Sequence, residues 1–214
     1  MLATLIFEFS AAIYTFVRYK MDKISRLITA ILITLGLFQL SEYMICGGLG
    51  LTSASWMKFG YIATAMLPIY GLHLIITIAE KKKPIILSIA YASAAIFIIY
   101  YIFDSSAISG QQCFANYAVF YSQGIMSQLF SIYYLVWILA CYIHAKAFSR
   151  QLPEKRKPLR AIIIGGAVFL GPTYLFNLID PTTVRAIPSI MCGFAIFFAM
   201  ALVFFVLPIS GKKR

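Results

Sequence analysis

Charge is scarce in this chain of 214 residues. Asp, Glu, Lys and Arg together make up 12% of it, against about 25% in an ordinary soluble domain. The acidic residues are the rarer sign, with 7 Asp and Glu against 18 Lys and Arg, while hydrophobic residues reach 62%. This composition excludes an ordinary soluble domain and is typical of a membrane protein.

The chain also lacks the motifs of common catalytic and cofactor sites. It contains neither H-E-x-x-H nor G-x-S-x-G, which would indicate a zinc protease or a serine hydrolase. Its 2 histidines are too few for a zinc hydrolase built within a helix bundle, and its last apolar stretch has no lysine that could hold retinal. We therefore expect neither enzymatic activity nor a metal or other cofactor.

Long apolar runs occupy most of the chain instead. Most of them reach the ~20 residues that a helix needs to cross a ~30 Å hydrocarbon core. Because backbone groups in lipid must be hydrogen-bonded within the segment, each run is predicted to be a helix. The fold class expected is an all-α integral membrane protein, with residues 1–214 forming one seven-helix domain. The predicted spans are 2–17, 27–46, 56–79, 85–103, 125–147, 161–180 and 187–208.

Basic residues are confined to alternate connections between these spans. Of the 18 Lys and Arg residues, 16 lie between the first two spans, after the third, around the gap after the fifth, or after the last. Only Lys58 and Arg185 lie on the other set of connections. Short basic loops stay cytoplasmic, so the N-terminus is predicted to be outside and the C-terminus cytoplasmic. The net charge of +11 is then a topology signal and an attraction to membrane lipids, and no nucleic-acid partner is expected.

The four cysteines divide between the outer face and the spans. Cys46 ends the second span at the outer face, and Cys113 lies in the longest outer connection. If that face meets an oxidising space, the two could form a disulfide, but two free thiols fit the sequence equally well. Cys141 and Cys192 lie within spans and are expected only to pack.

Polar side chains inside the spans are costly in lipid and are therefore functional candidates. All the charged and amide-bearing ones lie in the outer half of the membrane, which predicts a pocket for a small amphipathic or lipid-like ligand. The predicted ligand-binding residues are Glu8, Gln39, Glu42, Lys58, Tyr61, Gln128, Asn177 and Asp180. Two alternatives stay open: a purely structural role, with a Glu42–Lys58 pair joining spans 2 and 3, or an ion or proton pathway.

Two prolines lie in the middle of spans. Pro68 is in the third span, and Pro172 is in the sixth, downstream of Gly165 and Gly166. A proline removes one helical hydrogen bond and bends the helix. Such bends would make room for a cavity, although ordinary packing kinks explain them too.

At the third predicted span, Ser55–Ile62 (SWMKFGYI) is followed by Leu67–Leu74 (LPIYGLHL). With their Trp, Tyr, Leu-Pro and His, these two segments resemble the third span of the seven-helix N-terminal sensor region of bacterial histidine kinases. Arg160–Gly166 (RAIIIGG) is similar to its basic loop leading into an apolar run, and Ala186–Ile190 (AIPSI) to its Pro-Ser entry to the last span.

The resemblance implies a receptor-like input module in the bacterial inner membrane that signals to a cytoplasmic output domain. No kinase or other effector sequence follows the seventh span here, so the chain is expected to be the input part of a longer protein or to act through a separate cytoplasmic partner. A homodimer is a further expectation, because modules that drive dimeric outputs often dimerise. The alternative function is a transporter or channel for a small solute or ion that uses the same polar residues.

Overall fold

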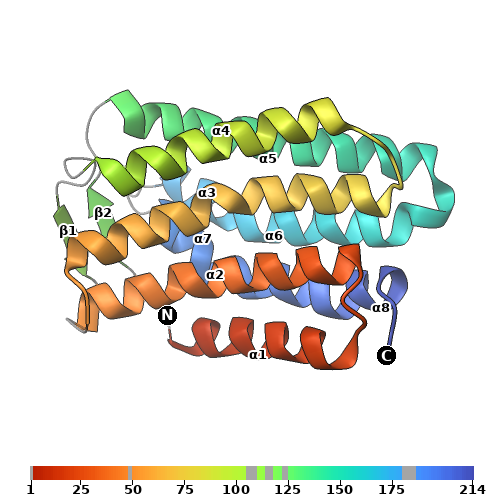
Figure 1. The fold of residues 1–214 in the computed structure, drawn as a ribbon, viewed down its shortest axis with the longest axis horizontal. Helices are drawn as coiled ribbons and strands as arrows, with labels where there is room; N and C mark the ends of the chain where they lie inside the picture. The colour runs from red at the N-terminus through yellow and green to blue at the C-terminus, as the bar shows by residue number, and fades with distance from the viewer. Residues whose placement is uncertain (1, 48–49, 105–109, 114–117, 122–124, 180–186) are drawn as a thin grey trace.

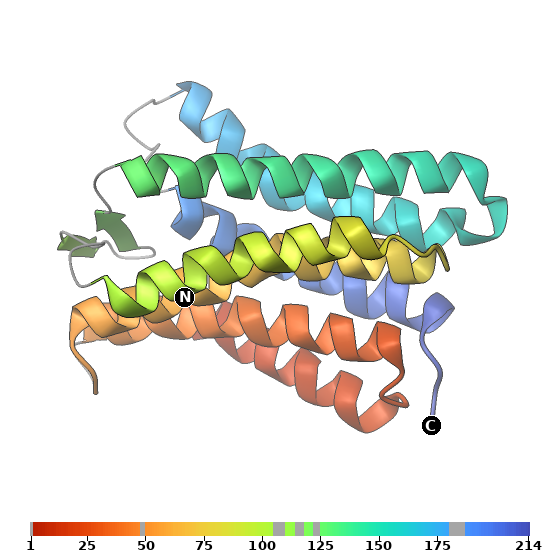
Figure 2. The same cartoon turned by 45° about the horizontal axis from the view of Figure 1, so that its top comes forward.

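The computed structural model describes residues 2–47, 50–104, 110–113, 118–121, 125–179 and 187–214. These form a bundle of helices that run roughly along one common axis, with a small hairpin at one end and the C-terminus at the other (Figures 1 and 2). The elements in chain order are α1 (Leu2–Arg18), α2 (Lys23–Gly47), α3 (Ser53–Ile78), α4 (Pro84–Phe103), β1 (Gly110–Cys113), β2 (Ala118–Tyr121), α5 (Ile125–Gln151), η1 (Pro153–Lys155), α6 (Arg156–Ile179), α7 (Ile187–Met200), the π-helix η3 (Ala201–Val206) and α8 (Leu207–Ser210).

Six of the described helical segments are long and apolar enough to cross a membrane. They are α2, α3, α4, α5, η1 with α6, and α7 continued through η3 and α8. The all-helical class is confirmed, and the length and apolar character of these six helices indicate a multi-pass membrane protein. The first predicted span is α1, whose 17 residues cover roughly 25 Å at about 1.5 Å each, short of a ~30 Å core. In Figure 1 its N-terminal end stops partway along α2.

Helices α2 and α3 form the centre of the bundle. In their most apolar windows 61% and 67% of the residues are buried, against 17% in α4 and 11% in α5, so these last two present most of their surface to lipid. The two central helices approach closely at Gly60, where an added Cβ would lie 2.6 Å from the Ser41 hydroxyl oxygen. Small residues at such a crossing allow backbones to pack directly, as is common between membrane helices.

The proline in α3 is contacted by side chains of α5. Pro68 lies inside the helix, as predicted, and removes the hydrogen bond that an N–H at this position would donate to the Thr64 carbonyl. The Tyr133 hydroxyl donates to the Ala65 carbonyl at 2.6 Å, and the Cys141 thiol donates to the Pro68 carbonyl at 3.3 Å. Two residues about two helical turns apart on α5 therefore bond to carbonyls about one turn apart on the interrupted part of α3.

The basic connections all lie at the end of the bundle that holds the C-terminus (Figure 1). Between described residues, the one ion pair is found at this end and joins the Lys155 ammonium to the Glu80 carboxylate at 2.6 Å. The hydrogen bond and the charge of Lys155 lower the pKa of Glu80 from its ordinary value of 4.5. This pair connects the turn after α3 to the turn before α6.

We expect the Glu80–Lys155 pair to contribute little stability at neutral pH, because exposed ion pairs are screened by water. Since the pKa of Glu80 is lowered, its contribution is complete above the ordinary pKa of 4.5 and is lost as the pH falls through the lowered value. Lys155→Gln should therefore unfold at a slightly lower temperature than the wild type at pH 7, and this small difference should disappear as the pH falls through the lowered pKa of Glu80. Thermal unfolding in detergent from pH 7 to pH 3 tests this; an equal loss in both proteins on acidification would contradict it.

Candidate functional site

A buried polar cluster joins α1, α2 and α7 in the half of the bundle nearer the hairpin. Glu8 from α1 is 0% exposed, and Gln39 and Glu42 from α2 are each 1% exposed. The Thr4 hydroxyl donates to the Gln39 side-chain oxygen at 3.1 Å, and the Ser189 hydroxyl of α7 donates to a Glu42 carboxylate oxygen. The predicted proximity of Glu8, Gln39 and Glu42 is thus found in the structure.

Glu8 differs from Glu42 in its partners. Both Glu8 carboxyl oxygens are buried and accept no hydrogen bond within the part of the chain that the structure describes. An ionisable group placed this way in a membrane helix is costly and is a functional candidate by default. This is the strongest chemical feature of the cluster.

Cys192 was not predicted to belong to this group, because a cysteine within an apolar span was expected only to pack. Its side chain is 5% exposed on α7. The thiol interacts electrostatically with the carboxyl groups of Glu42 and Glu8 and with the side chain of Gln39, which places it beside the polar cluster. Cys192 therefore belongs to the polar cluster as well as to the packing.

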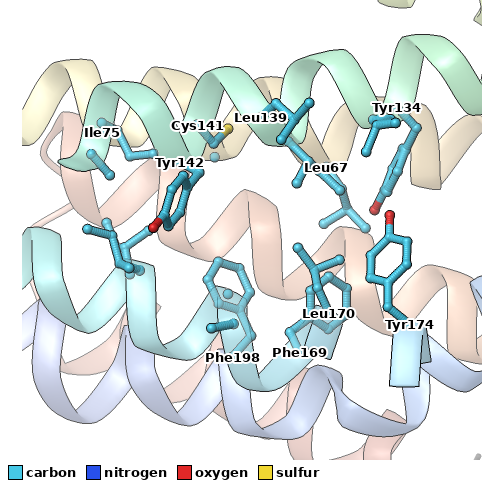
Figure 3. Close-up of a pocket in the computed structure, with 18 of the residues that line it drawn as sticks. Leu67, Ile75, Tyr134, Leu139, Cys141, Tyr142, Phe169, Leu170, Tyr174 and Phe198 are labelled. Carbon is cyan, nitrogen blue, oxygen red and sulfur yellow. The ribbon is translucent and has the colours of Figure 1, made fainter. Parts of the chain in front are cut away.

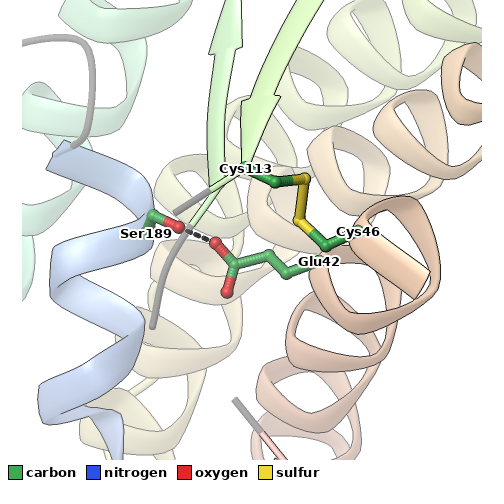
Figure 4. Close-up of a disulfide and its surroundings, with 4 residues drawn as sticks. All are labelled: Glu42, Cys46, Cys113 and Ser189. Atoms are coloured by element: carbon green, nitrogen blue, oxygen red, sulfur yellow. Dashed lines mark hydrogen bonds between the residues drawn. A yellow bond between two sulfur atoms is a disulfide. The ribbon is translucent and has the colours of Figure 1, made fainter. Parts of the chain in front are cut away.

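A disulfide lies next to this cluster at the hairpin end of the bundle. Cys46 is bonded to Cys113, with 5.7 Å between their Cα atoms, which resolves the choice left open by the sequence. Cys46 lies one helical turn beyond Glu42, so the bond fastens the end of strand β1 beside the Glu42–Ser189 hydrogen bond (Figure 4). The strand pairs with β2 in an antiparallel hairpin.

The other predicted site residues come from α3, α5 and α6. Lys58 is half-buried near the start of α3 and forms no ion pair with Glu42 in the described part of the chain, so the alternative of a Glu42–Lys58 pair joining spans 2 and 3 is not found. Tyr61 stacks on Tyr101 at 4.7 Å and meets Phe130 edge-on at 5.5 Å, within an aromatic group formed by α3, α4 and α5. Gln128 is exposed on α5, because the buried face of that helix carries Phe130 instead.

The predicted polar residues of α6 are only partly described. Asn177 is half-buried, and its side-chain oxygen has no hydrogen-bond partner among the described residues. Thr173, one turn earlier on the same face, is 0% exposed and its hydroxyl is likewise without a described partner. Asp180 lies outside the described residues.

A second candidate site is an apolar cavity of about 290 Å³ between α3, α5 and α6 (Figure 3). It contains none of the predicted site residues. The hydroxyl groups of Tyr134 and Tyr174 point toward one another near one end of it, and Tyr142 lies toward the other. The remaining lining is almost entirely aliphatic and aromatic, and includes Leu67, Gly71, Ile75, Leu139, Cys141, Ile162, Gly166, Phe169, Leu170 and Phe198.

The position of the cavity follows from proline and glycine. It adjoins the interrupted part of α3, where Cys141 bonds the Pro68 carbonyl, and a Cβ added at Gly166 would have no atom within 4 Å. The lining residues Leu139, Tyr142 and Tyr174 are 49%, 45% and 43% exposed, so the cavity opens sideways between α5 and α6 toward lipid. In the sequence, Pro68 and the glycines of the sixth span indicated that a cavity could form. The polar residues within the spans predicted a different site, in the other part of the bundle around Glu8 and Glu42.

No family model matches the chain, and neither a curated protein nor a solved structure matches it.

Proposed function

We propose that the chain is a receptor-like membrane module that binds a small, largely apolar ligand in the cavity between α3, α5 and α6. The observation that carries this proposal is the cavity itself. Its volume of about 290 Å³ is near the lower end of the range for small-molecule sites, which combine an apolar lining with a few polar groups. The hydroxyls of Tyr134, Tyr142 and Tyr174 are the polar groups here. They fit a lipid-like molecule that carries one hydroxyl or carbonyl.

The proposal includes an orientation. With α1 as a seventh span, tilted or locally thinning the bilayer to make up its length, the N-terminus is outside and the C-terminus cytoplasmic. The gathering of basic residues at the C-terminal end of the bundle supports this. The Cys46–Cys113 disulfide at the opposite end supports it independently, because disulfides persist in oxidising compartments. The resemblance to histidine kinase sensor regions implies the same orientation and a bacterial inner membrane.

The signal would pass along α3 and α5. A ligand in the cavity lies beside Cys141, which bonds the carbonyl of Pro68, so occupancy would favour one geometry of the proline-interrupted helix. At the cytoplasmic end, α3 leads directly to Glu80 and its pairing with Lys155 before α6. A ligand shifts such an equilibrium only by its differential affinity for the two states. The readout would be a cytoplasmic output domain or partner, with a homodimer as the expected assembly.

Gly166→Leu is expected to raise stability and abolish ligand binding. The leucine would occupy open space at the cavity wall, gain dispersion contacts and remove a helical glycine that costs about 1 kcal/mol relative to alanine. We expect a higher midpoint of thermal unfolding in detergent. We also expect slower reaction of Cys141 with N-ethylmaleimide in a Cys192→Ala background, because the leucine blocks access to the thiol.

Gly193→Leu is the matched control. Gly193 is an exposed helical glycine on α7, and an added Cβ there also has no atom within 4 Å, but it does not line the cavity. This variant should keep the labelling rate of Cys141. Equal rates in all three proteins would show that the cavity is not accessible and would count against the proposal.

A second function, proton-coupled or ion transport, is favoured by one observation, the buried Glu8 carboxyl without a described partner. Intramembrane carboxylates of this kind mark ion and proton pathways in transporters. Proteoliposomes with an internal pH dye test it. Proton flux that is lost in Glu8→Gln would favour transport, whereas vesicles no leakier than protein-free ones would leave the receptor proposal as the better account.

A further inference from the structure

A second hollow lies on the opposite, lipid-facing side of α6, between that helix and the α7–η3–α8 segment. Its volume is about 620 Å³. The floor is made of small residues, since a Cβ added at Gly165 would lie 2.6 Å from the Cβ of Ala201. The walls are exposed apolar side chains, among them Ile164, Phe197 and Phe205. We call this hollow the α6–α7 groove.

The cytoplasmic end of the groove is basic. Lys157 and Arg160 line it from the first turns of α6, and both are exposed. On the same face of α6 the groove continues to Val168, eleven residues after Lys157, which is roughly 16 Å at about 1.5 Å per residue. A cationic mouth therefore leads into an apolar channel about as long as a lipid acyl chain.

The π-helix η3 contributes to the same groove. Ala201 and Phe205, both within Ala201–Val206, supply part of its floor and wall. Single π-helical turns inside α-helices are rare and occur frequently at functional sites. The unusual segment of the last helix is thus placed where the groove is formed.

We propose that the α6–α7 groove binds one anionic phospholipid, with its phosphate between Lys157 and Arg160 and one acyl chain lying over Gly165 and Ala201. The charge favours an anionic over a neutral headgroup, and a guanidinium group matches phosphate geometry. The apolar channel favours a lipid over a soluble anion, which would leave the channel unused. Basic sites between membrane helices on the cytoplasmic side are a general mode of headgroup recognition. The site is separate from the cavity between α3, α5 and α6, and only its assignment to the inner leaflet rests on the proposed orientation.

Native mass spectrometry in mild detergent, with equimolar dioleoylphosphatidylglycerol and dioleoylphosphatidylcholine added, tests this site. The wild type is expected to retain the anionic dioleoylphosphatidylglycerol in preference to dioleoylphosphatidylcholine. Lys157→Gln with Arg160→Gln should reduce that preference roughly 25-fold, because each basic side chain near the surface contributes about a fivefold factor. Lys82→Gln with Lys83→Gln, an equal charge change on another cytoplasmic connection, should keep it.

A variant that leaves the charge unchanged separates the groove from general surface attraction. Ala161→Phe, in the groove between the basic mouth and Ile164, should weaken lipid retention while thermal unfolding shows a folded protein. Soluble glycerol 3-phosphate should not displace the lipid. Equal retention of both lipids, an equal loss in the Lys82/Lys83 variant, full retention in Ala161→Phe, or displacement by glycerol 3-phosphate would each overturn the proposal.

Discussion

Reduction of the Cys46–Cys113 disulfide is expected to lower the free energy of unfolding by up to about 4 kcal/mol. The two cysteines are 67 residues apart, and closing a loop of that length removes about this much conformational entropy from the unfolded chain. The figure is an upper value because unfolded membrane proteins in detergent retain helices and are already constrained. Thermal unfolding in detergent with and without a phosphine reductant measures the effect.

The matched control for reduction is Cys46→Ser with Cys113→Ser. This variant should unfold at the lower temperature of the reduced wild type and should be insensitive to reductant, whereas Cys141→Ala should keep the full response. A wild type whose unfolding temperature does not change on reduction, or which has four titratable thiols beforehand, would contradict the disulfide. Because Cys46 lies one turn beyond Glu42 (Figure 4), reduction should also speed labelling of Cys192 in the polar cluster.

Glu8→Met is expected to raise the free energy of unfolding by roughly 2 kcal/mol. The carboxyl of Glu8 is fully buried and accepts no hydrogen bond among the described residues. A polar ionisable group within a membrane helix costs a few kcal/mol, and an apolar side chain of similar length removes that cost. Denaturation in mixed micelles, followed by tryptophan fluorescence, measures the change.

Glu42→Met provides the contrast, because Glu42 accepts the hydrogen bond of Ser189. Removing one partner of a buried hydrogen bond typically costs about 1–3 kcal/mol, so this variant should be destabilised. If the free energy of unfolding rises in Glu8→Met and falls in Glu42→Met, Glu8 is retained at the expense of stability, as expected of a functional group. Destabilisation of both variants to the same degree would mean that Glu8 is held by a polar partner.

The helices were predictable because lipid leaves so few alternatives. The bounds of α2 through α6 were predicted to within about five residues. The prediction used the length of the apolar runs, the positions of the charged residues, and the need of backbone N–H and C=O groups in lipid to bond within the helix. The first span was harder, since α1 ends at Arg18 and is too short to be distinguished from a partly inserted helix. The π-helical turn at Ala201–Val206 has no signature in an apolar run.

The polar cluster was predictable in part, for geometric reasons. Gln39 and Glu42 are three residues apart and so share a face of α2, which the structure confirms. Depth in the membrane does not determine which way a side chain faces around its helix. For this reason the sequence did not show that Tyr61 packs on Tyr101 and Phe130 or that Gln128 lies on the exposed face of α5. Their neighbours depend on which helices pack together, and an apolar sequence with little amphipathic contrast carries almost no information about that.

The location of the apolar cavity could not be predicted from the sequence. Gly166 and Pro68 are visible in the sequence, but a cavity forms only where the side chains of several helices leave space between them. Predicting it requires the relative positions of those helices, which the sequence does not provide. The sequence indicated that prolines and glycines in the third and sixth spans could make room. The location between α3, α5 and α6, away from the charged residues, came only from the packing.

Native mass spectrometry of the protein purified in mild detergent, beside Gly166→Leu and Gly193→Leu, tests the proposed ligand site most directly. The account predicts a discrete co-purified mass on the wild type and on Gly193→Leu that is lost from Gly166→Leu, whose side chain fills the cavity. Addition of dioleoylphosphatidylglycerol should not displace that mass, because the lipid binds the separate α6–α7 groove. A bare chain in all three proteins, or the same adduct retained by Gly166→Leu, would contradict a ligand in the cavity between α3, α5 and α6.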